Sequence, residues 1–172
     1  TWLYATTASS FSTQGNAVVW GRDRFVAVGQ GTNKIIYSTA GVTWTSASTT
    51  IFATAGLGIA YGRDRFVAVG EGTNSFAYSS DYQGTSWTGI TSASSPFSTR
   101  GNGIAFNGSI FVAVGEGTAN TIAYSTDGIT WTGAGNTILT TAGYGVCWTG
   151  NKFMAVGSGT NTIAYSSNGT QW

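Results

Sequence analysis

Short apolar segments alternate with glycine-rich polar turns along the whole chain, and the alternation repeats about every forty residues. A phrase of the form Phe-Val-Ala-Val-Gly, with Met for the first Val in the last copy, occupies residues 25–29, 66–70, 111–115 and 153–157. After a short turn, each copy is followed by an apolar segment that ends in Tyr-Ser. Because β-branched and aromatic residues favour strands while Gly, Asn and Asp interrupt them, this pattern predicts short β-strands. We find no convincing 3.6-residue apolar period that would indicate a helix.

Five tryptophans mark the repeat and set its length. Trp2, Trp44, Trp87, Trp131 and Trp172 lie 42, 43, 44 and 41 residues apart. Each unit is interpreted as four strands: one at 17–20, 58–61, 103–106 and 145–148, the Phe-Val-Ala-Val phrase, the segment ending in Tyr-Ser, and one that begins at the tryptophan. Four short antiparallel strands in every 40–45 residues are typical of a β-propeller blade.

The expected fold is therefore one all-β domain over residues 1–172, a β-propeller with four four-stranded antiparallel blades in this chain. The blades are approximately 3–44, 45–87, 88–131 and 132–172. The first strand, at 1–4, is expected to complete the last blade, which would leave no sheet edge open to aggregation. Closure within one chain predicts a four-bladed ring, strand exchange between two chains predicts an eight-bladed one, and a longer native chain is a third alternative.

A longer period is visible in the segments that enter the first strand of each blade. Residues 11–16 and 97–102 share the pattern Phe-Ser-Thr-x-Gly-Asn, whereas residues 52–56 and 139–143 share Thr-Ala-Gly. This alternation indicates that the unit of duplication is a pair of blades.

The turns between the third and fourth strands resemble Asp-box repeats, the Ser-x-Asp-x-Gly-x-Thr-Trp hairpins of sialidase-like (BNR-repeat) propellers. The copies are degenerate: three lack the residue between Asp and Gly, one is longer, and Ala40 and Asn168 replace Asp. The resemblance implies a structural turn in which the Asp or Asn side chain accepts backbone hydrogen bonds, Gly adopts positive φ and Trp packs below. The residues that carry it are Ser38, Trp44, Ser79, Asp81, Trp87, Ser125, Asp127, Trp131, Ser166, Asn168 and Trp172.

Composition narrows the chemistry. Only 8% of residues are charged, and seven Lys and Arg balance six Asp and Glu, so no basic face for nucleic acid is expected. The chain has no histidine and a single cysteine, Cys147, which leaves few metal ligands or general bases, and we expect no metal and no cofactor. No apolar run approaches the ~20 residues that span a bilayer, so membrane insertion is not expected. The N-terminal residues show no signal-peptide pattern.

The candidate binding face carries the turns between the second and third strands. In a propeller these turns share one face with the loops that enter each blade, here at Thr13, Thr54, Thr99 and Thr141. The other face carries Arg-Asp-Arg at 22–24 and 63–65, interpreted as solvated hairpin ends. It therefore holds four of the chain's five arginines, and only Arg100 lies in a loop that enters a blade, whereas a sialidase-like substrate clamp needs three arginines. The candidate ligand-binding residues are Gln30, Thr32, Asn33, Glu71, Thr73, Asn74, Glu116, Thr118, Asn120, Thr160 and Asn161.

A ring of similar polar loops with little charge suits weak, repeated contacts, for which avidity supplies the affinity. We therefore expect a non-catalytic recognition or display module that binds a glycan or a surface protein, with no catalytic residues, on an extracellular, secreted or virion surface. The first alternative is a purely structural scaffold of a surface assembly. The second is a fragment of a sialidase-like glycoside hydrolase. Under any of these functions, the chain is expected to form a homo-oligomer through strand exchange or to be part of a larger assembly.

Overall fold

The structure is a computed structural model, which describes residues 5, 11–91 and 94–172. The described residues form strands, turns and bends, with no α-helix among them. The strands are β1 (Gln14–Gly21), β2 (Arg24–Gln30), β3 (Ile35–Ser38), β4 (Thr45–Ser48), β5 (Ala55–Gly62), β6 (Arg65–Glu71), β7 (Asn74–Ser79), β8 (Trp87–Thr91), β9 (Arg100–Phe106), β10 (Phe111–Glu116), β11 (Ile122–Ser125), β12 (Thr132–Gly133), β13 (Ala142–Trp148), β14 (Phe153–Ser158) and β15 (Ile163–Ser166).

The strands form four antiparallel meanders, which we call units 1 to 4: β1–β4, β5–β8, β9–β12 and β13–β15. The register repeats from unit to unit, because the first residue of each Phe-Val-Ala-Val phrase pairs with an aromatic residue, as in Phe25 with Trp20 and Phe153 with Trp148. Units 1 to 3 belong to one twelve-stranded sheet. They are joined within it by single ladder pairs, Gln30 with Ala55 and Glu71 with Arg100.

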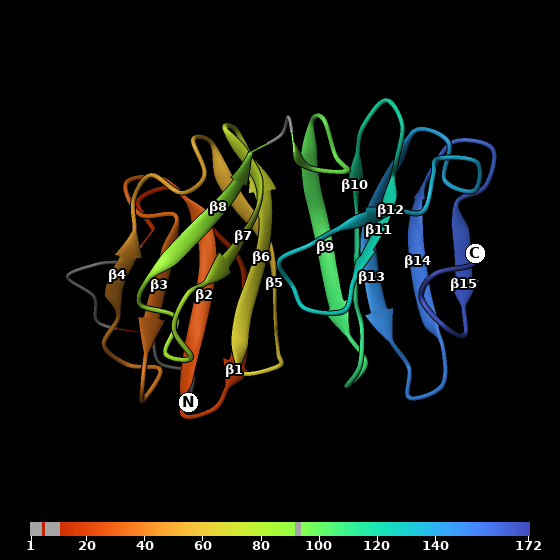
Figure 1. Ribbon diagram of the computed structural model, residues 1–172. Coiled ribbons are helices and arrows are strands. Elements are labelled where there is room, and N and C mark those ends of the chain that lie inside the picture. The colour runs from red at the N-terminus through yellow and green to blue at the C-terminus, as the bar shows by residue number, and fades with distance from the viewer. Residues whose placement is uncertain (1–4, 6–10, 92–93) are drawn as a thin grey trace.

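Successive units pack face to face and form an open arc (Figure 1). Their first strands, β1, β5, β9 and β13, contact one another along the arc. Close approach there requires glycine: a Cβ built on Gly58 would lie 3.2 Å from the Cα of Gly103, and one built on Gly103 would lie 3.2 Å from the Cα of Gly145. The small residues of the first strands therefore let the units converge on one side.

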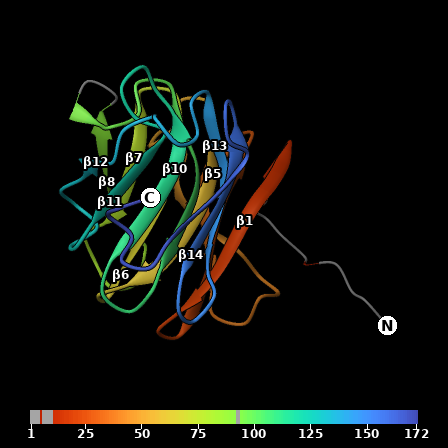
Figure 2. The same ribbon diagram turned by 90° about the vertical axis from the view of Figure 1, so that its right-hand side faces the viewer.

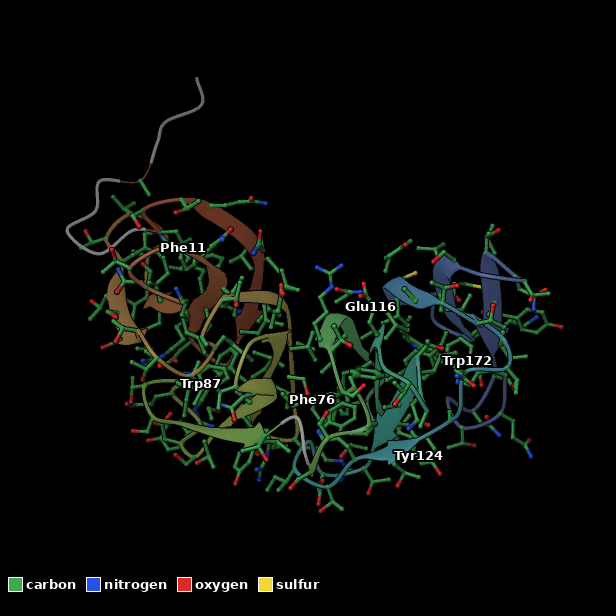
Figure 3. All side chains as sticks on the ribbon, turned by 90° about the horizontal axis from the view of Figure 1, so that it is seen from above. Phe11, Phe76, Trp87, Glu116, Tyr124 and Trp172 are labelled. Carbon is green, nitrogen blue, oxygen red and sulfur yellow. The ribbon has the colours of Figure 1, made fainter. Side chains whose placement is uncertain are left out.

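Large side chains fill the wider space between units. Phe76 of unit 2 lies with its ring centroid 4.3 Å from Trp131 and 5.2 Å from Phe97 of unit 3. Figure 3 shows Phe76 between these two units and Trp87 between units 1 and 2. The same layout recurs in three buried clusters, where Val28, Val69 and Val114 each pack against the following unit.

The prediction of an all-β, antiparallel fold is confirmed. The first strand of each unit is longer than predicted, since β1 starts at Gln14 rather than at residue 17. In β1, a bulge after Gly15 prolongs the pairing with β2. The sheets do not close into a ring within the described residues, so the propeller stays a prediction. The expected closing strand at 1–4 lies outside the described residues. Unit 4 has three strands in the described part of the chain. No described strand pairs with the outer edge of β15.

Candidate functional site

The loops of the predicted binding face gather at one end of the strands, along the upper edge of the arc in Figure 1. There the loop between the second and third strands of each unit lies beside the segment that enters its first strand. A backbone hydrogen bond of the same kind joins the two in every unit: the N–H groups of Thr13, Thr54, Thr99 and Thr141 donate to the carbonyls of Gln30, Glu71, Glu116 and Ser158, at 3.0–3.3 Å. We call this set of paired loops the loop end.

A second contact at the loop end uses side-chain hydroxyls. The N–H of Thr32 donates to Ser12 Oγ at 2.8 Å, and the N–H of Thr160 donates to Thr140 Oγ1 at the same distance. The Thr118 N–H donates to Ser98 Oγ at 3.1 Å. Thr32, Thr73, Thr118 and Thr160 are exposed residues. The hydroxyls of Thr32 and Thr160 also lie 3.3 and 3.5 Å from those of Ser12 and Thr140.

Glycine makes this pairing of loops sterically possible. Gly31, Gly72 and Gly159 have φ near +120°, a conformation that favours glycine. A Cβ at Gly31 would lie 2.2 Å from Ser12 Oγ. The Gly-Thr step of the motif is therefore explained by local packing, whatever else the loop does.

The predicted asparagines have a structural role. The Nδ2 groups of Asn74, Asn120 and Asn161 donate to the backbone carbonyls of Ile51, Pro96 and Ile138, at 2.6–3.3 Å, and so tie each turn to the preceding segment. Asn33 is buried, with 8% of its surface exposed. The structure thus ties Asn74, Asn120 and Asn161 to the preceding segment by hydrogen bonds. The exposed members of the predicted set are Thr32, Thr73, Thr118, Thr160 and Asn161.

The charged members meet in one cluster, at the contact between units 2 and 3. The Arg100 guanidinium donates to Glu116 Oε1 from Nη2 at 2.7 Å and from Nε at 3.0 Å, and its Nη1 lies 3.7 Å from Glu71 Oε2. Asn102 Nδ2 lies 3.4 Å from the same Glu116 oxygen. We call Glu71, Arg100, Asn102 and Glu116 the Arg100 cluster; Figure 3 shows Glu116 on the inner side of the arc.

The Arg100 cluster holds one guanidinium beside two carboxylates. The hydrogen bond from Arg100 to Glu116 raises the arginine pKa above its ordinary value, against the opposing effect of burial, so the guanidinium stays charged. Gln30 occupies the position of the two carboxylates in unit 1, and Ser158 occupies it in unit 4. The exposed Tyr144 ring stands nearby, with its hydroxyl 3.0 Å from Ser158 Oγ. Sequence reasoning located Arg100 in an entry loop, but did not place it between two glutamates.

Two further features of the described residues concern metal binding and membrane spanning. No group of three or more Asp, Glu, Cys or His side chains able to hold a metal ion occurs among the described residues. Nor is any described helix long and apolar enough to cross a membrane.

The opposite end carries the turns between third and fourth strands. In unit 3, Asp127 Oδ1 accepts from the N–H groups of Ile129 and Thr130 at 2.8 and 2.7 Å, and Ser125 Oγ accepts from Gly128 N–H at 2.8 Å. Burial raises the pKa of Asp127, but these N–H donors and the Ser125 hydroxyl outweigh it, so the pKa lies below its usual value.

The other turns use the same contacts where their residues allow it. Asn168 Oδ1 accepts from Thr170 and Gln171 N–H at 3.0 Å, and Asp81 accepts from Thr85 and Ser86 N–H at 3.0 Å. The indole N–H groups of Trp44, Trp87 and Trp172 donate to the glycine carbonyl three residues earlier. Unit 1 has Ala40 in place of the acceptor, so this turn lacks its side-chain cap.

Replacing Ala40 with Asp is expected to stabilise the protein by about 1 kcal/mol at neutral pH, because an introduced carboxylate can accept from the turn N–H groups as Asp127 does. An acid whose folded-state pKa is lowered contributes stability above its unfolded pKa and loses it as the pH falls through the folded value. The gain, measured by urea unfolding at pH 7 and at pH 3, should therefore shrink at pH 3. An Ala40→Asn variant, which has no titratable group, should keep its gain at both pH values.

The Arg-Asp-Arg turns, also at this end, are less solvated than expected. Arg24 is only 8% exposed and lies over the Tyr37 ring at 5.6 Å. Arg63 donates to the carbonyl of Ser109 in the next unit at 2.9 Å. The interpretation as solvated ends is wrong for Arg24, because its aliphatic stem and guanidinium cover an aromatic ring, a favourable arrangement for arginine.

The comparisons with known proteins inform the fold only. No family model and no curated protein matches the sequence. Among solved structures, the chain is similar to a GH74 enzyme of Niastella koreensis, with 20% identity and a TM-score of 0.63, over 91% of this chain and 23% of that one. It is also similar to the computationally designed Ika4 protein, with 10% identity and a TM-score of 0.65, over 97% of this chain and 98% of that one. A chain of a Nidogen/Laminin complex is similar with 15% identity and a TM-score of 0.61, over 84% of this chain and 55% of that one. The chain thus spans less than a quarter of the GH74 enzyme and just over half of the nidogen/laminin chain, and at these identities the likeness concerns the β fold alone.

Proposed function

We propose that this protein is a non-catalytic recognition module that binds a glycan through its loop end, on an extracellular or virion surface. The observation that carries the proposal is the fourfold repetition at the loop end: each unit presents an exposed threonine on a turn that backbone and side-chain hydrogen bonds hold rigidly. Rigid, repeated polar groups suit a ligand with many similar hydroxyls, since several weak contacts add through avidity.

The Arg100 cluster supplies a second kind of contact for the same ligand class. Glu71 is 37% exposed at its side chain, as is Arg100, so both keep hydrogen-bonding capacity toward solvent. An exposed aromatic ring at Tyr144 offers a flat apolar surface beside them. Sugar rings present both hydroxyls and an apolar face, so this combination favours a neutral glycan over a strongly charged ligand.

The finer architecture that we propose is a β-propeller whose blades include units 1 to 4, with residues 1–4 of the same chain or of a second copy supplying the fourth strand beside β15. The repeated register and the convergence of the first strands support it. In this proposal, the turns that contain Asp81, Asp127 and Asn168 are degenerate Asp boxes. The alternative role as a scaffold is favoured by the apolar faces that units 1 and 4 leave exposed. The hydrolase-fragment alternative gains least, since four of five arginines lie away from the loop end.

A glycan array tests the proposal. The protein, displayed multivalently, is expected to bind a group of neutral glycans. A variant with Thr→Val at 32, 73, 118 and 160 is expected to lose at least about tenfold in binding, because Val has nearly the shape of Thr but carries a methyl group in place of the hydroxyl.

The matched control is Thr→Val at 39 and 126, two exposed threonines in the turns at the other end. It should bind like the natural protein. If no glycan binds, or if both variants bind equally well, the loop end is not a glycan site.

A further inference from the structure

The two end units each leave one apolar face uncovered. On unit 1, Val18 and Trp20 are 60% and 52% exposed; on unit 4, Val156, Ile163 and Tyr165 are 48%, 65% and 61% exposed. The unit 4 face is turned toward the viewer in Figure 2. These two surfaces, the unit 1 face and the unit 4 face, point out of opposite ends of the arc.

The same positions are buried wherever a neighbouring unit covers them. Val156 corresponds to Val69 and Val114, both with no exposed surface, and Ile163 corresponds to Phe76, also fully buried, and to Ile122, 2% exposed. The unit 4 face is therefore built like the faces that units 1 to 3 bury against their successors.

The contact between units 2 and 3 shows what such a face requires of its partner. Phe76 inserts between Phe97 and Trp131, with ring centroids 5.2 and 4.3 Å away. Val69 lies over Gly101, where an added Cβ would come within 2.6 Å of the valine Cβ. An aromatic pair and a glycine thus form the receiving surface.

The unit 1 face carries the counterparts of that surface, and no described residue fills the space between them. Phe11, Trp44 and Gly15 correspond to Phe97, Trp131 and Gly101, and all three line an open apolar hollow of about 440 Å³. The entry segments agree, since residues 11–16 match residues 97–102 of unit 3 rather than those of unit 2 or 4. A unit of type 2 or 4 is therefore the expected neighbour of unit 1.

We propose that the unit 1 face is the docking surface for the unit 4 face of a second copy of this chain. Ile163 of one copy enters the hollow between Phe11 and Trp44 of the other, and Val156 covers Gly15. The charges agree as well: Glu71 and Arg100 at the contact of units 2 and 3 are replaced here by Ser158 and Gln14, so these two positions bring no unpaired carboxylate or guanidinium into the contact. The two faces are different and complementary, which makes the pairing head-to-tail, and two copies that close on each other form a ring. This inference does not depend on glycan binding.

The first test is the mass in solution with Cys147 as reporter. Light scattering or native mass spectrometry should give 35.6 kDa, twice the 17.8 kDa of one chain, as concentration rises. Cys147 is exposed in the single chain, whereas its counterpart Ala60 belongs to the same buried cluster as Phe111 of the next unit. The thiol should therefore react with a small alkylating reagent when the protein is dilute and become protected as the copies pair.

Variants on the two faces separate head-to-tail pairing from other modes. Ile163→Asp and Val18→Asp each change an exposed side chain, so both should fold, and each should weaken pairing at least about tenfold. An equimolar mixture of the two should recover a complex of two chains, because one intact pair of faces remains. The control is Val42→Asp: Val42 is 55% exposed, and its counterpart Ile129 is still 36% exposed in unit 3, which has neighbours on both sides.

Several outcomes would overturn the proposal. A monomer with reactive Cys147 at every concentration means that the faces do not pair, and a monomer with protected Cys147 means that the chain covers its own face. A dimer that survives Val18→Asp or Ile163→Asp alone indicates pairing of like faces. A series of larger masses would support head-to-tail contact but contradict a closed ring of two.

Discussion

The Phe76→Ala variant is expected to lose about 3–5 kcal/mol of unfolding free energy, because it removes a large ring from a fully packed site. Phe76 has no exposed surface and fills the space between units 2 and 3, in contact with Phe97 and Trp131. Truncation leaves a cavity between units 2 and 3. Neither unit can move inward to fill it without disturbing the ladder pair of Glu71 with Arg100. Urea unfolding followed by tryptophan fluorescence measures the loss.

Two further variants show whether the cavity is the cause. Phe76→Leu keeps most of the volume and should cost under about 1.5 kcal/mol. Tyr82→Ala removes an aromatic ring that is 47% exposed and should cost under about 1 kcal/mol. A loss below about 1 kcal/mol in Phe76→Ala itself would show that units 2 and 3 do not pack in this way.

Gly70→Ala is expected to destabilise the protein by about 3 kcal/mol or more, although it adds a single methyl group. A Cβ at this position would lie 2.3 Å from the carbonyl oxygen of Ala55 and 2.7 Å from the Phe52 ring. Ala55 is held by its pairing with both Glu71 and Gln30, so the backbone cannot yield without breaking ladder contacts in two units. Thermal and urea unfolding should both report the loss.

Gly145→Ala provides the matched control on a first strand. A Cβ there meets only the Val156 side chain, at 3.5 Å, and its φ is not in the left-handed region. At concentrations where the chain is monomeric, its stability should change by less than about 1 kcal/mol. If Gly70→Ala destabilised the protein as little as Gly145→Ala, the close approach of β5 and Phe52 to Gly70 would be wrong.

Neighbouring turn residues of the predicted binding face differ in solvent exposure, and their sequence does not show this difference. Thr32 and Asn33 look alike as turn residues, and both are polar and adjacent. Only the tertiary structure shows that the threonine side chain is exposed while the asparagine is buried, since the following strand turns one outward and the other toward the chain. Arg24 is a similar case, because nothing in the turn sequence reveals the Tyr37 ring beneath it.

The repeat by itself determined the strand content, the length of each unit and the register of its pairing. It could do so because strand pairing and turn chemistry are local: Phe25 finds Trp20 across a short turn, and Asp127 finds the N–H groups two and three residues ahead. Tertiary structure decided what depends on how units stack: the position of Arg100 between two glutamates of different units, the aromatic pair that holds Phe76, and the exposure of Val18 and Ile163. Identical residues at equivalent positions, such as Val114 and Val156, become core or surface according to whether a neighbouring unit covers them.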